Sequence, residues 1–422
     1  MKQIRKLPGK HSVRLFFLIT WISYFSIYLG RMNFSASMSD MITNGGFGKT
    51  ELGGVAAAFF LSYGLGQIIS GVLGDRFSQS LLVFFGLLGS AAANLLFWMA
   101  PNASIMTWLW FLNGAAQSLI WAPMARLIAD RTTGAQCVRI VVLLSTSGPA
   151  GMFCAYALSA VMIRAGGWKP CFWSAAVWLL AVAVLWYTGI RSLESYADKY
   201  GKPEVLATPD SRSSTKYKSP RPHLLAVTGL GWLVIAAWLH GILKDGLITW
   251  IPTYLTETFS IEPFISITLT TLLPVVNLTG VYLANRLNRR LFNNEAKTAL
   301  CFFVATLAAI IFMIAFGDYS MYGSVLVFAM ISSAMTAVNT AFISLVPIHF
   351  QRFGSVSTVS GLLNATTYLG SALASVLFAR TAEVFGWGGV RGSWCVIAIT
   401  GAVCCMFSIS KWRAFRSDIY KD

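Results

Sequence analysis

Apolar stretches of membrane-spanning length dominate this sequence of 422 residues. A helix needs roughly 20 apolar residues to cross the hydrocarbon core of a bilayer. Glycine, proline and charged residues divide the chain into twelve stretches of about that length or longer. We therefore predict an all-α membrane protein with twelve transmembrane helices, over residues 14–41, 51–73, 81–100, 104–128, 138–163, 168–189, 224–256, 262–285, 296–316, 320–347, 356–380 and 389–410.

The charged residues fit this prediction. They make up only 11% of the chain, against about 25% in soluble proteins. The net charge of +16 comes from lysines and arginines that cluster between the apolar stretches, mostly on the side that carries both termini. The positive-inside rule then predicts an inner-membrane protein in the lipid bilayer with both termini in the cytoplasm. It argues against nucleic acid as a partner, because no soluble basic domain remains.

One long polar segment separates the first six predicted spans from the last six. We predict an N-terminal half over residues 1–190, a cytoplasmic linker over 191–222 and a C-terminal half over 223–422. Membrane transporters are often built from two such repeats, with the substrate site near the midplane between them. The sequence therefore predicts two pseudo-symmetric six-helix halves.

No enzyme constellation is present in the sequence. The seven cysteines lie mostly in apolar stretches and lack metal-ligand spacing, so we expect no metal site. The phosphate-cradling glycine motif of nucleotide hydrolases is also missing. We expect no cofactor and no catalysis, and any transport must use a gradient or an exchange.

Two cationic residues lie inside predicted spans that hold corresponding positions in the two halves: Arg31 in the first span and Lys244 in the seventh. A charge near the bilayer centre costs about 2.5 to 3.5 kcal/mol on insertion scales, so such residues usually have a functional role. Two like charges that face each other could be neutralised by an oxyanion. Arginine offers a planar fork of donors for it, whereas lysine is closer to a point charge. The pair predicts an anion site.

Structural interpretations of the same residues remain open. Arg31 could pair with an acid from another span, and Asp245 could neutralise Lys244, although adjacent helix residues point about 100° apart. Asp245 could equally be a gating group or a cation-coupling group. His240 precedes Lys244 by four residues and is either a protonatable ligand or a packing residue.

Further polar groups could complete the site or control access to it. Tyr24 and Tyr28 lie on the helical face of Arg31, and their hydroxyls could bind a substrate oxygen. Gln67, Asn364 and Tyr368 are candidates of the same kind, with hydrogen bonding between helices as the alternative. At the cytoplasmic end of the second span, the sequence Gly-Val-Leu-Gly-Asp-Arg ends in Asp75 and Arg76, which suit a gate.

Several motifs resemble those of the major facilitator superfamily, and within it the organophosphate:phosphate antiporters for glycerol phosphate and hexose phosphate. The superfamily resemblance depends on residues 71–76 and on the six-plus-six layout of the spans. The narrower one depends on residues 24–33, on Ser62-Tyr-Gly and on residues 361–371, and above all on residues 243–255, which end in Trp-Ile-Pro-Thr-Tyr-Leu. The resemblance implies the major facilitator fold.

The resemblance also implies roles for individual residues. Arg31 stands at the family's first phosphate-binding arginine, and Lys244 stands at the second. Two positions depart from the family pattern: Gln67 replaces a lysine and Gly148 replaces a histidine. Three further residues stand at tyrosines that contact substrate in the family, namely Tyr24, Tyr28 and Tyr368.

The expected function is therefore secondary active transport of a small organic anion by a monomer. The first expectation is a phosphate ester exchanged for inorganic phosphate by rocker-switch alternating access. The alternative is a carboxylate or another organic anion carried with protons or sodium, with His240 or Asp245 as the coupling group. A third interpretation is a ligand sensor with a transporter fold, which the short tail over residues 411–422 disfavours.

Overall fold

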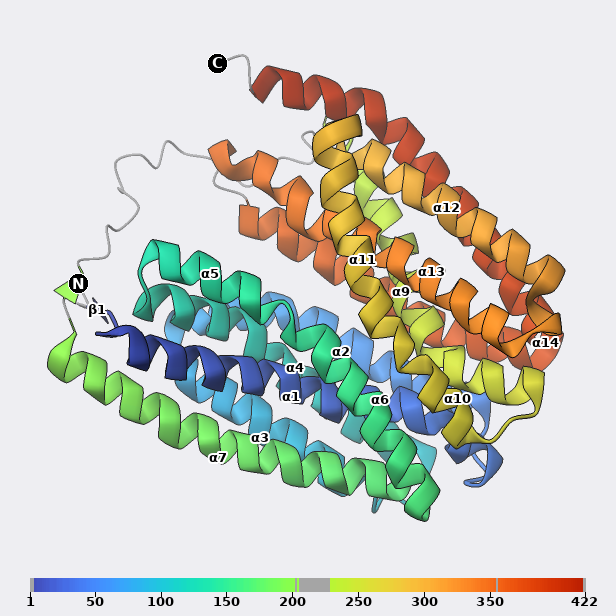
Figure 1. Ribbon diagram of the computed structural model, residues 1–422, viewed down its shortest axis with the longest axis horizontal. Helices are drawn as coiled ribbons and strands as arrows, with labels where there is room; N and C mark the ends of the chain where they lie inside the picture. Colours follow the sequence, from blue (N-terminus) through green and yellow to red (C-terminus); the bar gives the residue numbers. More distant parts are fainter. Residues whose placement is uncertain (1–3, 202, 205–227, 354–355, 420–422) are drawn as a thin grey trace.

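Long helices make up nearly all of the computed structural model, which describes residues 4–201, 203–204, 228–353 and 356–419 (Figure 1). Two short strands near the ends of the first helical group pair antiparallel to each other. This group comprises β1 (Ile4–Arg5), α1 (Lys10–Thr43), α2 (Lys49–Arg76), α3 (Gln79–Phe97), α4 (Ala103–Arg131), α5 (Gly134–Leu144), α6 (Ser147–Gly166), α7 (Lys169–Tyr200) and β2 (Pro203–Glu204).

The second helical group follows the linker region. Side-chain oxygens of Asn294 and Ser320 cap two of its helices by accepting a hydrogen bond from the backbone N–H three residues on. The group comprises α9 (Leu230–Phe259), α10 (Pro263–Thr270), α11 (Leu272–Leu287), a π-helical segment (Asn288–Phe292), α12 (Glu295–Phe316), a 3-10 turn (Gly317–Tyr319), α13 (Met321–Asn339), a second π-helical segment (Thr340–Leu345), a 3-10 segment (Val346–Phe353) and α14 (Val356–Ile419).

Two of the predicted spans are each divided into two helices. The fifth becomes α5 and α6, and the eighth becomes α10 and α11. In both cases a proline, Pro149 or Pro274, is the third residue of the second helix. Proline has no N–H to donate to the carbonyl four residues back, which weakens the helix at Ser145 and at Thr270. The prolines therefore explain both interruptions.

The last helix, α14, reverses direction inside its 64 residues. A straight helix of that length would extend about 96 Å, three times the thickness of a bilayer core. Gly386 has φ 66° and ψ −174°, a backbone conformation that glycine adopts without strain. Figure 1 shows the chain turning back at the lower right, from the orange arm to the dark red arm. The two arms match the predicted spans 356–380 and 389–410.

Ten segments of the described chain are long and apolar enough to cross a membrane, by length and composition. The two arms of α14 count as one of these segments, and the 29-residue helix α4 is not among them. With α4 and the second arm included, the arrangement is consistent with the twelve predicted spans. The chain is a multi-pass helical membrane protein.

The helices form two bundles that pack against each other (Figure 1). In the first, α1 packs on α6 and α7, and α4 packs on α2 and α3. In the second, α14 packs on α9 and α12, and α13 packs on α11 and α12. Contacts between the bundles run mainly from α2 to the first arm of α14, with smaller ones from α6 to α10 and α11 and from α1 to α9. The contacts within each group of helices exceed those between the two groups.

Both ends of the described chain lie toward the same end of the helices, at the left of Figure 1. Helix α7 continues to Tyr200, so the first ten residues of the predicted linker are helical. Strand β2 follows at residues 203–204 and is held by β1, where Ile4 is opposite Glu204. The rest of the predicted linker, from residue 205 onward, lies outside the described residues.

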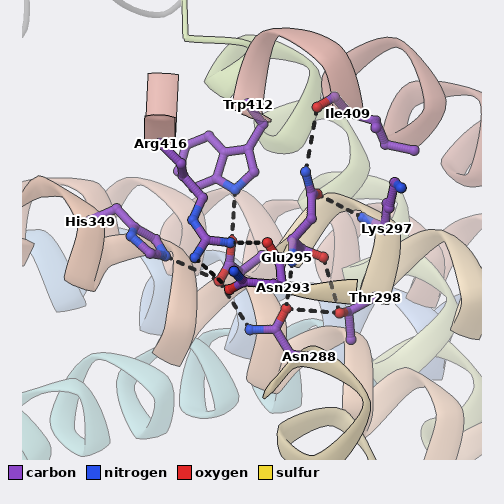
Figure 2. A network of polar contacts seen from close by, with 10 residues as sticks. Asn288, Asn293, Glu295, Lys297, Thr298, His349, Ile409, Trp412 and Arg416 are labelled. Atoms are coloured by element: carbon purple, nitrogen blue, oxygen red, sulfur yellow. Dashed lines mark hydrogen bonds and ion pairs between the residues drawn. The ribbon is translucent and has the colours of Figure 1, made fainter. Parts of the chain in front are cut away.

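A buried carboxylate joins four segments of the second bundle (Figure 2). Glu295 is 2% exposed and begins α12. Its Oε1 accepts hydrogen bonds from Asn288 Nδ2 at 3.0 Å and His349 Nε2 at 3.1 Å. Its Oε2 accepts hydrogen bonds from Trp412 Nε1 at 2.8 Å and Arg416 Nη1 at 3.3 Å. The network ties the second arm of α14 to the rest of the bundle.

We expect Glu295→Ala to lower the thermal stability of the detergent-solubilised protein strongly. Removal of one partner of a buried ion pair typically costs about 3–5 kcal/mol, because the remaining groups lose their acceptor. The measurement is the unfolding midpoint of variant and wild type. Glu262→Ala is the matched control, because Glu262 is exposed and its side chain makes no capping hydrogen bond. Equal midpoints for the two variants would contradict the role of the network.

Candidate functional site

Arg31 is buried among aromatic rings from both bundles. The residue is 9% exposed and lies in the second half of α1. Its Cζ lies 5.0 Å from the ring centroids of Phe59 and Tyr63 on α2, and 5.6 Å from those of Phe60 on α2 and Tyr368 on α14. Aromatic faces attract cations through their quadrupole, most strongly where water is excluded. The four rings thus stabilise the guanidinium without cancelling its charge.

No acidic side chain forms an ion pair with Arg31 in the part of the chain that the structure describes. Its buried Nε also has no hydrogen-bond acceptor there. A buried charge that is neither paired nor fully hydrogen-bonded is costly. An oxyanion from outside the chain would supply both the charge and the acceptor.

Buried amides hold the backbone beside Arg31 against α3 and α4. The carbonyl of Gly30 accepts hydrogen bonds from Asn94 Nδ2 at 3.0 Å and Asn113 Nδ2 at 2.8 Å. Asn94 also bonds to Asn33 at 2.8 Å. A Cβ at residue 30 would lie 2.5 Å from Cδ1 of Leu179 on α7, so a larger residue here would require that buried side chain to shift. The network fixes where α1 presents its arginine.

Lys244 is paired with Asp245, which is the structural alternative that the sequence left open. Its Nζ lies 2.7 Å from Oδ1 of Asp245, although the two residues are adjacent on α9. The expected angular separation of neighbouring residues is overcome because the lysine side chain is long and flexible. The second oxygen of Asp245 accepts a hydrogen bond from Ser371 Oγ on α14 at 2.7 Å. The ion pair is therefore anchored across the packing of α9 and α14.

A small cavity separates the two bundles beside Arg31. It encloses about 20 Å³, which is room for roughly one water molecule. A ligand of several atoms cannot enter this cavity without movement of its walls. The cavity is lined by Arg31, Met32, Phe34, Ser35, Ala56, Phe59, Phe60, Trp110, Asp245, Ile248 and Thr249.

Of the three candidate tyrosines, only Tyr368 contacts Arg31 through its ring. Tyr24 and Tyr28 are half-buried and meet edge to face, with centroids 6.0 Å apart. A Cβ at Gly148 would lie 3.0 Å from the Tyr28 hydroxyl oxygen. A larger residue at position 148 would therefore press on Tyr28, so the glycine leaves room for the tyrosine hydroxyl.

His240 faces the interior of the second bundle. It is fully buried, and its Nε2 lies 3.0 Å from the backbone carbonyl of Met335 on α13. Its ring also meets that of Phe342 at a centroid distance of 6.4 Å. It is not among the residues that line the cavity beside Arg31. This environment favours the packing interpretation of His240.

The remaining candidates lie apart from the Arg31 cavity. Gln67 and Asn364 are half-buried and are absent from the cavity lining. Asp75 and Arg76 form the last turn of α2, where Arg76 is exposed, and the side chain of Asp75 lies outside the described part of the chain. The structure therefore brings together Arg31, Tyr368 and the Lys244–Asp245 pair.

Polar contacts also join the bundles at the end opposite the termini. Lys49 Nζ lies 2.7 Å from Oε2 of Glu257, which also accepts a hydrogen bond from Trp387 Nε1 at 2.8 Å. Thr50 donates from its backbone N–H to Oε1 of Glu383 at 2.9 Å and from its hydroxyl to Oε2 at 2.5 Å. We call these five residues the inter-bundle cluster.

Sequence reasoning missed the inter-bundle cluster and three of the four rings around Arg31, those of Phe59, Phe60 and Tyr63. The cluster residues lie at span ends, where charged side chains are expected and carry no special signal. An apolar span contains Phe59, Phe60 and Tyr63 within five residues. Such aromatic residues are expected both in a packing core and around a buried cation. Only the distance of their rings from Arg31 distinguishes the cation site from the packing core.

The family of the chain follows from comparison with known proteins. The model of the Major Facilitator Superfamily matches residues 20–375. The chain therefore belongs to this superfamily of membrane transporters, as its motifs predicted.

Several known proteins are similar to this chain over most of its length. A probable hexose phosphate transport protein of Chlamydia muridarum is 21% identical, over 97% of this chain and 92% of its own length. The glycerol-3-phosphate transporter of Bacillus subtilis is 24% identical, over 91% and 90%. The membrane sensor protein UhpC of Escherichia coli is 20% identical, over 88% and 86%. The resemblance to organophosphate transporters is thus confirmed.

Solved structures support the fold. A bacterial homologue of the human lysosomal transporter Spinster superimposes with a TM-score of 0.76 at 14% identity, over 97% of this chain and 99% of the other. A D-xylose–proton symporter superimposes with a TM-score of 0.66 at 15% identity, over 94% and 97%. The major facilitator fold predicted from the sequence is confirmed.

The amide network beside Arg31 predicts a specific loss of stability. Asn113→Ala removes a donor to Gly30 and the acceptor for the Ser90 hydroxyl, which lies 2.6 Å away. Unsatisfied buried polar groups cost about 1–3 kcal/mol each, so we expect a lower unfolding midpoint. Asn364→Ala removes the same chemical groups at a half-buried position and should have a smaller effect. A midpoint unchanged in Asn113→Ala would contradict the role given to the network.

Proposed function

We propose that this protein is a secondary active transporter of the inner membrane that exchanges a phosphate ester for inorganic phosphate. The observation that carries the proposal is the buried Arg31, which has no acidic partner among the described residues. Its guanidinium can hold two oxygens of a phosphate group in a bidentate arrangement. Relatives named as hexose phosphate and glycerol-3-phosphate transporters support the choice of a phosphate ester.

The ligand would bind between the bundles. Arg31 comes from α1 and Lys244 from α9, so a ligand that touches both contacts both halves of the chain. Tyr368 could donate its hydroxyl to the same anion, as could Tyr24 and Tyr28 after a movement of α1. Gln67 and Asn364 remain candidates for the non-phosphate part of the ligand. A ligand held in this way couples its own binding to the relative position of the bundles.

Alternating access would then require the contacts between the bundles to break and re-form. With both termini in the cytoplasm, as we propose, the inter-bundle cluster would lie at the outer face and hold it closed. Asp75 and Arg76, at the other end of α2, are proposed to serve the opposite gate. The cavity beside Arg31 has room for about one water, which suits a site that opens only when the bundles move.

Transport by reconstituted protein tests the proposal. We expect uptake of labelled glycerol 3-phosphate into proteoliposomes loaded with inorganic phosphate, and no uptake without internal phosphate. Arg31→Ala should lower the uptake at least about 100-fold, because roughly 3 kcal/mol of a buried charge-assisted contact is lost. Arg31→Lys should give an intermediate rate, because it keeps the charge and loses the fork.

Arg413→Ala is the matched control, since it removes an exposed arginine from the second arm of α14. Normal uptake by Arg31→Ala would exclude the proposed site. Uptake that depends on a pH gradient and not on internal phosphate would instead favour proton-coupled symport, an alternative that the presence of Asp245 beside Lys244 supports. Ligand binding without any counterflow would favour a sensor, like the relative named as a membrane sensor.

The inter-bundle cluster predicts a shift in conformation when it is weakened. In Glu257→Gln/Glu383→Gln, the charged acceptors of Lys49, Trp387 and Thr50 become neutral amides. Partly exposed ion pairs contribute up to about 1 kcal/mol, so the outer end should open about five times more often. Hydrogen–deuterium exchange of residues 44–51 should become faster by that factor.

Glu194→Gln serves as the control for this measurement. It breaks an ion pair with Arg131, 3.2 Å long, that lies within the first bundle. Exchange at residues 44–51 should stay at the wild-type rate in this variant. Equal exchange in the control and the double variant would rule out a gate at the cluster.

A further inference from the structure

Asp245 lines the candidate site and is held there by hydrogen bonds. It is the one acidic residue among those that line the cavity beside Arg31 within the described chain. Its side chain is 8% exposed, and both carboxylate oxygens are occupied. Oδ1 accepts from Lys244 Nζ at 2.7 Å, and Oδ2 accepts from Ser371 Oγ at 2.7 Å. The carboxylate is thus held in place from α9 and α14 together.

The charges of the site sum to one positive charge. Arg31 and Lys244 contribute two positive charges, and Asp245 contributes one negative charge. Other titratable groups around Asp245 are His240 on α9 and Tyr368 on α14. Helix α13, which also packs on α9, carries no Asp, Glu, Lys, Arg or His. The net charge of the empty site therefore does not balance the two negative charges of a dianion.

Binding of a dianion would leave a net negative charge in a buried site, whereas a ligand with a single negative charge would leave it neutral. Buried net charge is strongly disfavoured. A ligand that draws Lys244 away from Asp245 does not change this sum, because both side chains keep their charges and Asp245 itself lines the cavity. Phosphate esters exist in both forms near neutral pH, since their second pKa is about 6.

We propose that Asp245 selects the charge of the ligand, so that the site takes singly charged oxyanions and disfavours dianions. For a phosphate ester, the bound species is then the monoanion. The inference rests on the proposed function in one respect: Arg31 and Lys244 bind the anion. It assigns to Asp245 a role in specificity that is separate from gating and from cation coupling.

The test measures the affinity of purified full-length protein for glycerol 3-phosphate at about pH 5.5 and about pH 7.5 by calorimetry. Over this interval the monoanion fraction of a phosphate ester falls about 25-fold, and the dianion fraction rises about fourfold. Wild-type affinity for total ligand should therefore weaken about 25-fold. Asp245→Asn removes the negative charge and keeps the shape, so its affinity should strengthen about fourfold.

Ser371→Ala is the matched control. It removes the hydrogen bond to Asp245 and leaves all charges in place, so its affinity should weaken with pH as in the wild type. His240 and Tyr368 are common to all three proteins and cannot produce the difference in sign. If Asp245→Asn and wild type respond to pH in the same direction, the inference is overturned, and the binding of glycerol 3-phosphate still supports the proposed function.

Two carboxylates, used at about pH 7.5, separate the inference from the identity of the substrate. Lactate carries one charge and succinate two, and Asp245→Asn should raise the affinity for succinate relative to lactate at least about tenfold. If no glycerol 3-phosphate binds but the carboxylates show this change, the proposed substrate class fails and the inference stands. An unchanged preference between the carboxylates overturns it, and lack of binding by all three probes overturns both proposals.

Discussion

The buried charge of Arg31 is the constraint on which the centre of this protein depends. A guanidinium in a membrane-spanning helix must be kept from lipid, and here rings from α2 and α14 cover it. Those helices belong to different bundles, so the two bundles meet at the arginine. Behind it, buried amides on α3 and α4 hold the Gly30 carbonyl, which sets the position of α1. The charge thus organises contacts both within and between the bundles.

The polar contacts of the molecule differ in strength according to where they lie. Inside the second bundle, the Glu295 network is buried and joins α12 to the second arm of α14. Between the bundles, the contacts of the inter-bundle cluster are few and partly exposed, as in the pair of Lys49 and Glu257, whose side chains are 18% and 30% exposed. Buried networks are costly to break, whereas exposed pairs contribute little. This distribution supports the proposal that each bundle moves as a body.

Hydrophobic periodicity and charge placement were sufficient for the helical membrane architecture, because spans of about 20 apolar residues have few alternatives. The same reasoning missed the helix breaks at Pro149 and Pro274, where a single missing N–H interrupts an apolar run. It also left open whether Lys244 pairs with Asp245, because a helical wheel describes the directions of Cβ atoms and not the reach of a long side chain. Neither hydrophobic periodicity nor charge placement predicts the distances between side chains on different helices.

By itself, the sequence determined that the chain crosses the membrane many times and that cations lie inside the spans, since both follow from the local order of residues. The tertiary structure decided which side chains contact those cations. It placed Arg31 among rings from two bundles and joined Lys244 to Asp245 and Ser371. The net charge of the candidate site depends on these side-chain contacts, because a charge is cancelled only by a partner within a few ångströms. Such proximity arises when distant parts of the chain pack together.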